Sequence, residues 1–164
     1  MQKKLLISTL MAGALSVMST TIPQQAAAQE TNVKLTIVNP AGLYDPAPNG
    51  YSHAIVANGG SRIAYIAGQG GEDRTGALSP KFADQVRQAY TNLRTALEAV
   101  GAKPDQVTKI TTYVVNYDQS MLKVMGENVT KTFKDALPAQ TLVPVPRLAL
   151  DGMLFEVDAV AVLD

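Results

Sequence analysis

The strongest constraint on the fold is a long amphipathic stripe in the middle of the chain. Ser79 and Pro80 suit the start of a helix, because serine is a good N-cap and proline is favoured in the first turn. Gly101 suits its end, since the residue after the last turn is often left-handed. Between them apolar residues recur at spacings of three and four: Phe82, Val86, Tyr90, Leu93, Leu97 and Val100. This spacing predicts a helix with one buried face.

A second, shorter stripe follows and predicts another helix. Asp118 can cap its start, and Pro138 ends the region. Gly126 lies inside it and lowers helix stability by about 1 kcal/mol relative to alanine. The apolar residues of the stripe are Met121, Met125, Val129 and Phe133.

Six short apolar runs around these helices predict strands. They cover residues 34–38, 52–58, 62–69, 107–115, 139–147 and 153–163. Gly59-Gly60 predicts a hairpin between the second and third runs, and a turn at Asp151-Gly152 predicts one between the last two. Pro144 and Pro146 point their missing N–H groups the same way, which favours a sheet edge for their strand.

The expected fold is α+β, a mixed six-stranded sheet with two helices on one face. Each helix links two strands and can serve as a right-handed crossover. Two helices cover only one face of the sheet, and the other face still carries Ile, Val, Leu and Ala. An uncovered apolar face of this kind predicts self-association.

The N-terminus has the three parts of a secretory signal. Lys3 and Lys4 precede an apolar run from Leu5 to Met18, and small residues lead to Ala28. The pattern predicts cleavage after Ala28, so residues 29–164 are expected to form a single domain in the periplasm or outside the cell. The alternative is a membrane anchor, but the run is short for a span, which needs about 20 residues.

Composition excludes several classes of site. The chain has no Cys and one His, which argues against disulfides, thiol nucleophiles and His-rich metal clusters. Removing Lys3 and Lys4 leaves 12 basic and 14 acidic residues, so the mature chain lacks the excess of positive charge that is typical of nucleic-acid-binding domains. We expect no metal and no cofactor, so catalysis has to use carboxylate, amide, hydroxyl and water.

The order and spacing of several segments, none of them specific alone, now point to a family. The segments are Gly50-Tyr51-Ser52-His53-Ala54, Ala67-Gly68-Gln69, the helix with Gln85, Arg87, Asn92, Leu97 and Gly101, Pro138-Ala139-Gln140-Thr141, and Phe155-Glu156-Val157-Asp158-Ala159. Together they resemble the RidA family, also called YjgF, over about residues 39 to 163. The resemblance implies a chorismate-mutase-like fold and a homotrimer with three pockets between subunits.

It also implies a reaction and a set of site residues. Active family members hydrolyse reactive enamines and imines to 2-oxo acids and ammonia. By this resemblance Glu156 positions the attacking water, and position 140 holds the substrate carboxylate. The expected catalytic residues are Glu156 and Gln140, and the expected substrate-binding residues are Tyr51, Ala67, Gly68, Glu127, Gln140 and Leu142.

The departures from the family pattern bear on activity. Gln140 stands where active members have an arginine, and losing that charge-assisted contact costs about 2–5 kcal/mol of binding. Ala67 replaces a serine, and a family asparagine falls at Gly126 or Glu127. Arg147 cannot substitute within one subunit, since seven strand residues span about 23 Å and reverse the face. An arginine from a neighbouring subunit remains an alternative.

Two carboxyl groups on one predicted strand and the single histidine each have a functional and a structural interpretation. Glu156 and Asp158 share a strand face with apolar residues, which predicts a raised pKa for at least one carboxyl and suits acid–base work. The plainer interpretation is an ion pair or a solvent-facing edge, and the resemblance favours function for Glu156 only. His53 either lines the pocket or packs as an ordinary side chain, and the latter is commoner for a single histidine.

Three functional hypotheses follow. The first is a divergent RidA-like protein that binds a small metabolite between subunits and retains weak imine or enamine hydrolysis. The second is a non-catalytic binding or interaction protein, which export favours because enzymes that make such imines are mostly cytoplasmic. The third is an enzyme with altered chemistry on another small substrate.

Overall fold

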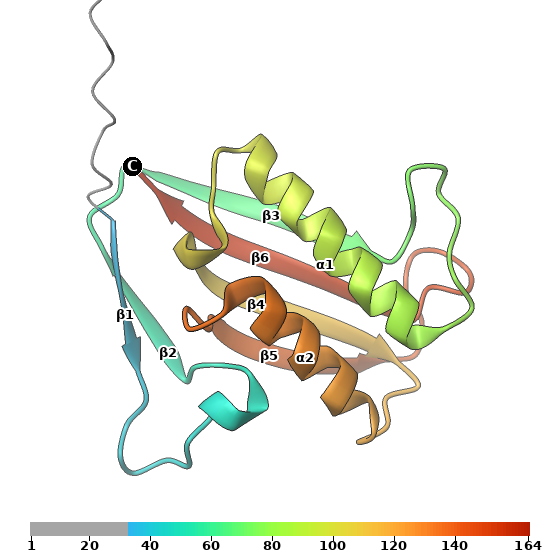
Figure 1. Cartoon of the computed structure of the whole chain (residues 1–164), viewed down its shortest axis with the longest axis horizontal. Coiled ribbons are helices and arrows are strands. Elements are labelled where there is room, and N and C mark those ends of the chain that lie inside the picture. Colours follow the sequence, from blue (N-terminus) through green and yellow to red (C-terminus); the bar gives the residue numbers. More distant parts are fainter. Residues whose placement is uncertain (1–32) are drawn as a thin grey trace, which may run out of the picture.

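The computed structural model describes residues 33–164, and the predicted signal segment lies outside these residues. Within these residues the chain forms two long helices and six strands (Figure 1). In order they are β1 (Lys34–Val38), η1 (Ala47–Asn49), β2 (Ala54–Asn58), β3 (Arg62–Gly70), α1 (Phe82–Ala99), η2 (Pro104–Gln106), β4 (Val107–Val115), α2 (Met121–Phe133), β5 (Ala139–Val145) and β6 (Phe155–Leu163). None of the helices within residues 33–164 is long and apolar enough to cross a membrane.

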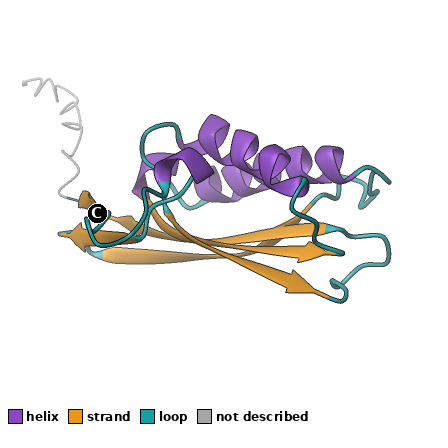
Figure 2. Ribbon diagram, turned by 90° about the horizontal axis from the view of Figure 1, so that it is seen from below, coloured by secondary structure: helices purple, strands orange, loops and turns teal. Residues whose placement is uncertain are grey.

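The main sheet has four strands in the order β3-β6-β4-β5. β6 runs antiparallel to both β3 and β4, and β4 runs parallel to β5. Each long helix therefore connects two parallel strands, as a crossover must. Figure 2 shows both helices on the same face of the sheet, which confirms the predicted α+β class with one covered face.

Two expectations about strand pairing are wrong. The six strands do not form one sheet, because β1 and β2 pair only with each other as a separate two-stranded sheet. Neither predicted hairpin forms: β2 and β3 lie in different sheets, and β6 inserts between β3 and β4 instead of pairing with β5. A turn motif predicts only where the chain reverses direction. The pairing partner depends instead on which strand can lie in the interior of the sheet, hydrogen-bonded to a neighbour on each side.

The edge position of the proline strand is confirmed. β5 is the last strand of the main sheet, and Pro144 lies opposite Val114 of β4. β6 alternates buried and half-buried residues along its whole length and has full hydrogen-bonding capacity, so it occupies the centre. A proline strand lacks a donor and suits an edge.

The predicted apolar stripes form the core between helices and sheet. On α1, Val86, Tyr90, Leu93 and Leu97 are buried, and on α2 Met125, Val129 and Phe133 are buried. They pack with buried residues of β4 and β6, including Ile110, Val114, Phe155 and Val157. Val100 is the exception, since it lies exposed beyond the last turn of α1.

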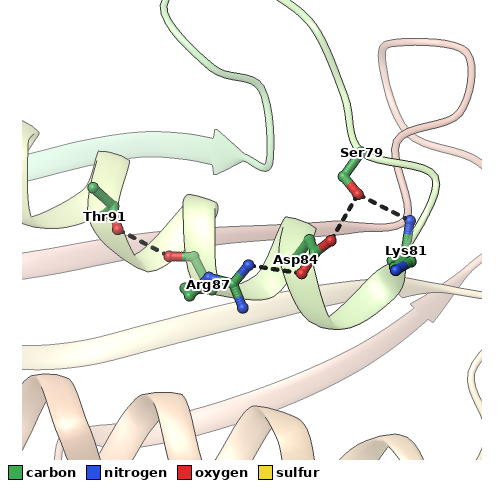
Figure 3. Close-up of polar contacts among 5 residues, drawn as sticks. All are labelled: Ser79, Lys81, Asp84, Arg87 and Thr91. Atoms are coloured by element: carbon green, nitrogen blue, oxygen red, sulfur yellow. Dashed lines mark hydrogen bonds and ion pairs between the residues drawn. The ribbon is translucent and has the colours of Figure 1, made fainter.

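The start of α1 differs in detail from the prediction. The N-cap is Lys81, not Ser79. The Ser79 hydroxyl accepts a hydrogen bond from the Lys81 amide at 3.2 Å and donates one to Asp84 at 3.1 Å (Figure 3). Asp84 also forms an ion pair with Arg87 at 2.7 Å, so the polar network around Ser79 supports the first turn from outside it.

One buried polar side chain joins α1 to the central strand. Gln85 donates to the carbonyl oxygens of Ser79 at 2.7 Å and Gly152 at 2.8 Å, and accepts from the Leu154 amide at 2.8 Å. Gly71 packs directly beneath it, and a Cβ there would lie 2.5 Å from Gln85 Cα. The glutamine thus fixes the start of the helix against the entry to β6.

Candidate functional site

A groove of about 980 Å³ lies between α2, β5 and the loop that contains η1. Four of the predicted site residues line it: Tyr51, Glu127, Gln140 and Leu142. The structure therefore brings together residues that are far apart in the sequence. Tyr44, Lys123 and Lys131 also line the groove and were not predicted from the sequence. The lysines' four-residue spacing from Glu127 on the predicted helix is the signal that could have found them.

The loop that carries Tyr51 is held against the start of β5. The Ser52 amide donates to the Pro138 carbonyl at 3.0 Å, and the Ser52 hydroxyl donates to the Leu137 carbonyl at 2.7 Å. Gly50 has a φ of 80°, a conformation that favours glycine. It packs against α2, where a Cβ on Gly50 would lie 3.6 Å from Gly126 Cα. These contacts position Tyr51 at the groove.

Aromatic rings gather at the same loop. Tyr44 and Tyr51 lie edge to face with ring centroids 6.4 Å apart, and their hydroxyls are hydrogen-bonded. His53 lies edge-on to both rings, and its Nε2 contacts the Tyr44 carbonyl oxygen at 2.9 Å. His53 does not line the groove, so it supports the tyrosines by packing.

Gln140 lies on the helix-covered face of the sheet. It is opposite the buried Ile110 of β4, and its Nε2 donates to the Thr112 hydroxyl at 3.3 Å. Leu142 follows on the same face. A neutral amide engaged in this way offers a ligand one remaining donor and its carbonyl oxygen.

Glu156 lies on the opposite, open face of the sheet. It is opposite Tyr113 of β4 and Gly70 of β3. Gly68 lies beside it, and any side chain at Gly68 would overlap the Glu156 carboxyl. Ala67 and Gly68 occupy the β-bulge of β3, where the register with β6 shifts. The bulge thus makes room for the carboxylate.

The electrostatics of this carboxyl agree with the sequence-based prediction. Burial, and then the charges of Glu72 and Asp158, raise the pKa of Glu156. Asp158 is instead occupied as an acceptor from the Thr111 amide at 3.0 Å and the Tyr113 hydroxyl at 3.1 Å. The hydrogen bond to Asp158 raises the pKa of Tyr113, and burial lowers the pKa of Lys109. Glu156 is therefore the carboxyl with acceptor capacity to spare.

One chain does not bring its two predicted catalytic residues together. Gln140 faces the helices and Glu156 faces away from them, because their opposite partners, Ile110 and Tyr113, differ by three positions along β4. Arg147 does not compensate, since it lies beyond the end of β5 and pairs with Asp151 at 3.8 Å. No group of three or more His, Cys, Asp or Glu side chains suited to a metal ion occurs within residues 33–164.

Comparison with known proteins places this geometry in a family. Residues 44–163 match the family model described as Endoribonuclease L-PSP. A RutC family protein of Aquifex aeolicus is 36% identical over 71% of this chain and 92% of its own length. The chain belongs to the RidA family.

Solved RidA-family structures share the fold. The Rid-family protein YyfB from Yersinia pestis, described as of unknown function, superposes with a TM-score of 0.75 at 32% identity, covering 79% of this chain and 98% of that one. A bovine relative named 2-iminobutanoate/2-iminopropanoate deaminase is 32% identical over 68% of this chain and 79% of its own length. The RidA resemblance seen in the sequence is confirmed.

Proposed function

We propose that this RidA-family protein binds a small metabolite at the groove and retains weak hydrolysis of enamines and imines to 2-oxo acids and ammonia. The observation that carries the proposal is Glu156, a half-buried carboxyl with a raised pKa and free acceptor capacity beside Gly68. Relatives from cattle and from the mite Dermatophagoides farinae bear the name of a deaminase of this type.

The chemistry requires one base and one anchor. Ionised Glu156 accepts a proton from water as the water oxygen bonds to the imine carbon, and the imine nitrogen takes up a proton. The resulting carbinolamine loses ammonia and leaves the 2-oxo acid, so no redox partner is needed. Gln140 touches the substrate through its amide, with less binding energy than an arginine supplies.

The opposite placement of Gln140 and Glu156 supports self-association, and the family resemblance suggests a homotrimer. A site that uses both residues has to combine the groove of one copy with the open sheet face of another. That face exposes Ile63 and Tyr65, which gives it the apolar character of a contact surface. We propose that pockets form between subunits for this reason.

A coupled assay tests the catalytic proposal. An amino-acid oxidase generates imines in the presence of semicarbazide, and the protein is expected to accelerate imine loss. Glu156→Ala is expected to abolish the acceleration, and Gln140→Arg to increase it. Lys134→Gln, exposed and outside the groove, is the matched control. No acceleration by either the wild type or Gln140→Arg would refute hydrolysis.

The second candidate is a non-catalytic ligand-binding or interaction protein. The observation that favours it is the contact of Gln140 with Thr112, which turns the residue at the family's arginine position into a member of an internal polar pair. Ligand binding without acceleration in the same assay would support this candidate.

We also propose export, with cleavage after Ala28. The support is the sequence of residues 1–28 alone, and the test is N-terminal sequencing of protein recovered from an expressing cell's envelope or medium. Gln29 is the expected first residue. A chain that keeps Lys3 and Lys4 would contradict the proposal.

A further inference from the structure

The groove contains more binding capacity than a short imino acid can use. Its volume of about 980 Å³ is at the upper end of the range for clefts that hold drug-sized ligands, roughly 300–1,000 Å³. A three- or four-carbon acid leaves most of that volume empty. The side chains around the remainder therefore indicate which larger ligand fits.

One wall carries positive charge. Lys123, Glu127 and Lys131 follow one another at four-residue spacing on α2, and all three line the groove. Neither lysine forms an ion pair with any residue in the described part of the chain. Two ammonium groups against one carboxylate leave this wall net positive, and they flank the groove that also contains Gln140.

The other wall is aromatic and apolar. Tyr44 and Tyr51 present their rings from the η1 loop, and Leu122 and Leu142 add apolar surface from α2 and β5. Tyr44 is 62% exposed, which is high for an aromatic side chain in a packed loop. Rings that are fixed by mutual contact and by His53 form a ready surface for a flat or apolar group.

We infer that the groove takes an amphiphilic anion, a carboxylate carried on an aromatic or extended apolar body, with Lys123 and Lys131 supplying the positive charge that Gln140 lacks. The apolar body lies against Tyr44, Tyr51 and Leu142, and the carboxylate lies toward α2. The inference rests on the proposed ligand-binding role of the groove and names its ligand class.

Gly126 provides a way to block the groove without disturbing the core. It lines the groove from the middle of α2, and a Cβ added there would meet no atom within 4 Å. Leucine at this position extends into open space, so Gly126→Leu is expected to fold and to obstruct the ligand. Gly126→Ala is the matched variant that leaves most of the space free.

The test compares charged and neutral forms of one probe by calorimetry. We expect 3-phenylpropionate to bind at millimolar or lower concentration, and 3-phenylpropionamide and acetate to bind at least tenfold more weakly. The double variant Lys123→Gln/Lys131→Gln is expected to lose about tenfold in affinity for the acid, in line with two solvent-exposed charge contacts. Lys134→Gln, a lysine just beyond the helix and outside the groove, is expected to bind normally.

Several results would overturn the inference. They are no binding of the acid, equal binding of acid and amide, unchanged affinity in the double lysine variant, or unchanged affinity in a folded Gly126→Leu protein. The imine assay is run in parallel on the same samples. Imine hydrolysis without selective binding of the aryl acid refutes the ligand class alone, and selective binding without hydrolysis refutes the catalytic proposal alone.

Discussion

Glu156 illustrates how neighbouring residues set the behaviour of a single carboxyl group. Its pKa is raised by burial and then by the negative charges of Glu72 and Asp158. The Oε2 atom of Glu72 is itself buried without a hydrogen-bond partner. A catalytic base has to be ionised, so the proposed activity falls as the pH drops through the raised pKa.

We predict that Glu72→Gln lowers the pKa of Glu156. Removing one nearby negative charge makes the ionised form of Glu156 less unfavourable. Carboxyl-carbon NMR titration measures the shift directly, and the acid limb of the imine-hydrolysis profile should move to lower pH with it. Glu98→Gln, exposed on α1 and outside the groove, should leave the Glu156 titration in place. An unchanged or higher pKa in Glu72→Gln would contradict the assignment.

We also predict that Glu156→Gln stabilises the fold at neutral pH. The folded-state pKa is raised above the unfolded value of about 4.3, so the carboxyl favours folding only while it is protonated. That contribution is complete below the unfolded pKa and is lost as the pH rises through the folded one. Urea unfolding should show the variant to be more stable than the wild type near neutral pH, with a smaller difference near about pH 4. A difference independent of pH would exclude this explanation.

At the scale of elements, the attachment of α1 to β6 depends on Gln85. Three hydrogen bonds link this buried side chain to two carbonyl oxygens and one amide outside the helix. Gln85→Leu roughly preserves the volume of the side chain but removes its amide, so those three backbone groups are left without a hydrogen-bond partner. At 1–3 kcal/mol for each buried group, we expect a loss of roughly 3 kcal/mol or more in the free energy of unfolding. A loss below about 1 kcal/mol in a urea titration would show that water replaces the amide.

Two glycines of these elements should respond in opposite ways to the same change. Gly126→Ala adds a Cβ into open space on α2 and should stabilise the protein by up to about 1 kcal/mol through helix propensity. Gly71→Ala places a Cβ 2.5 Å from Gln85 Cα and should destabilise it by about 1–3 kcal/mol. Thermal unfolding measures both, and changes of the same sign would contradict this packing of the two glycines.

The helices could be predicted from the sequence, whereas the pairing of the strands could not. The stripes of α1 and α2 were predictable because helix periodicity depends on neighbours three and four residues apart. Strand partners were not, because Gly59-Gly60 and Asp151-Gly152 report only a reversal of the chain. The lysines of the groove were missed for a related reason: Lys123 and Lys131 gain a role only when the η1 loop and β5 are placed opposite α2.

For the whole molecule, the open sheet face is an exposed apolar surface that no helix covers. Ile63 and Tyr65 are 58% and 77% exposed, and they lie opposite Val162 and Val160 of β6. A charge on this exposed apolar face should oppose self-association more than a charge elsewhere on the surface.

We therefore predict that Tyr65→Lys dissociates the proposed trimer into monomers. Light scattering with size-exclusion chromatography measures the mass. Leu150→Lys, which places the same charge on an exposed apolar residue of the β5–β6 loop, is the control and should remain associated. A wild-type monomer at micromolar concentration would contradict the assembly, and with it the shared pocket.

The candidate site could be predicted from the sequence only in part. Family resemblance identified Tyr51, Gln140 and Glu156, and four predicted residues do meet in the groove. That Gln140 and Glu156 lie on opposite faces depends on the register of β4 with both β5 and β6, which no local pattern encodes.

The central position of β6 also has a consequence for when the protein can fold. The strand that separates β3 from β4 follows both of them, and also α2 and β5, along the chain, so the sheet cannot close until β6 has been synthesised. Until then β3 and β4 lack their shared partner, and the nascent chain has no complete core to close around. Closing the sheet therefore requires contacts between segments that are far apart in the sequence, which predicts slower folding than local strand pairing would allow.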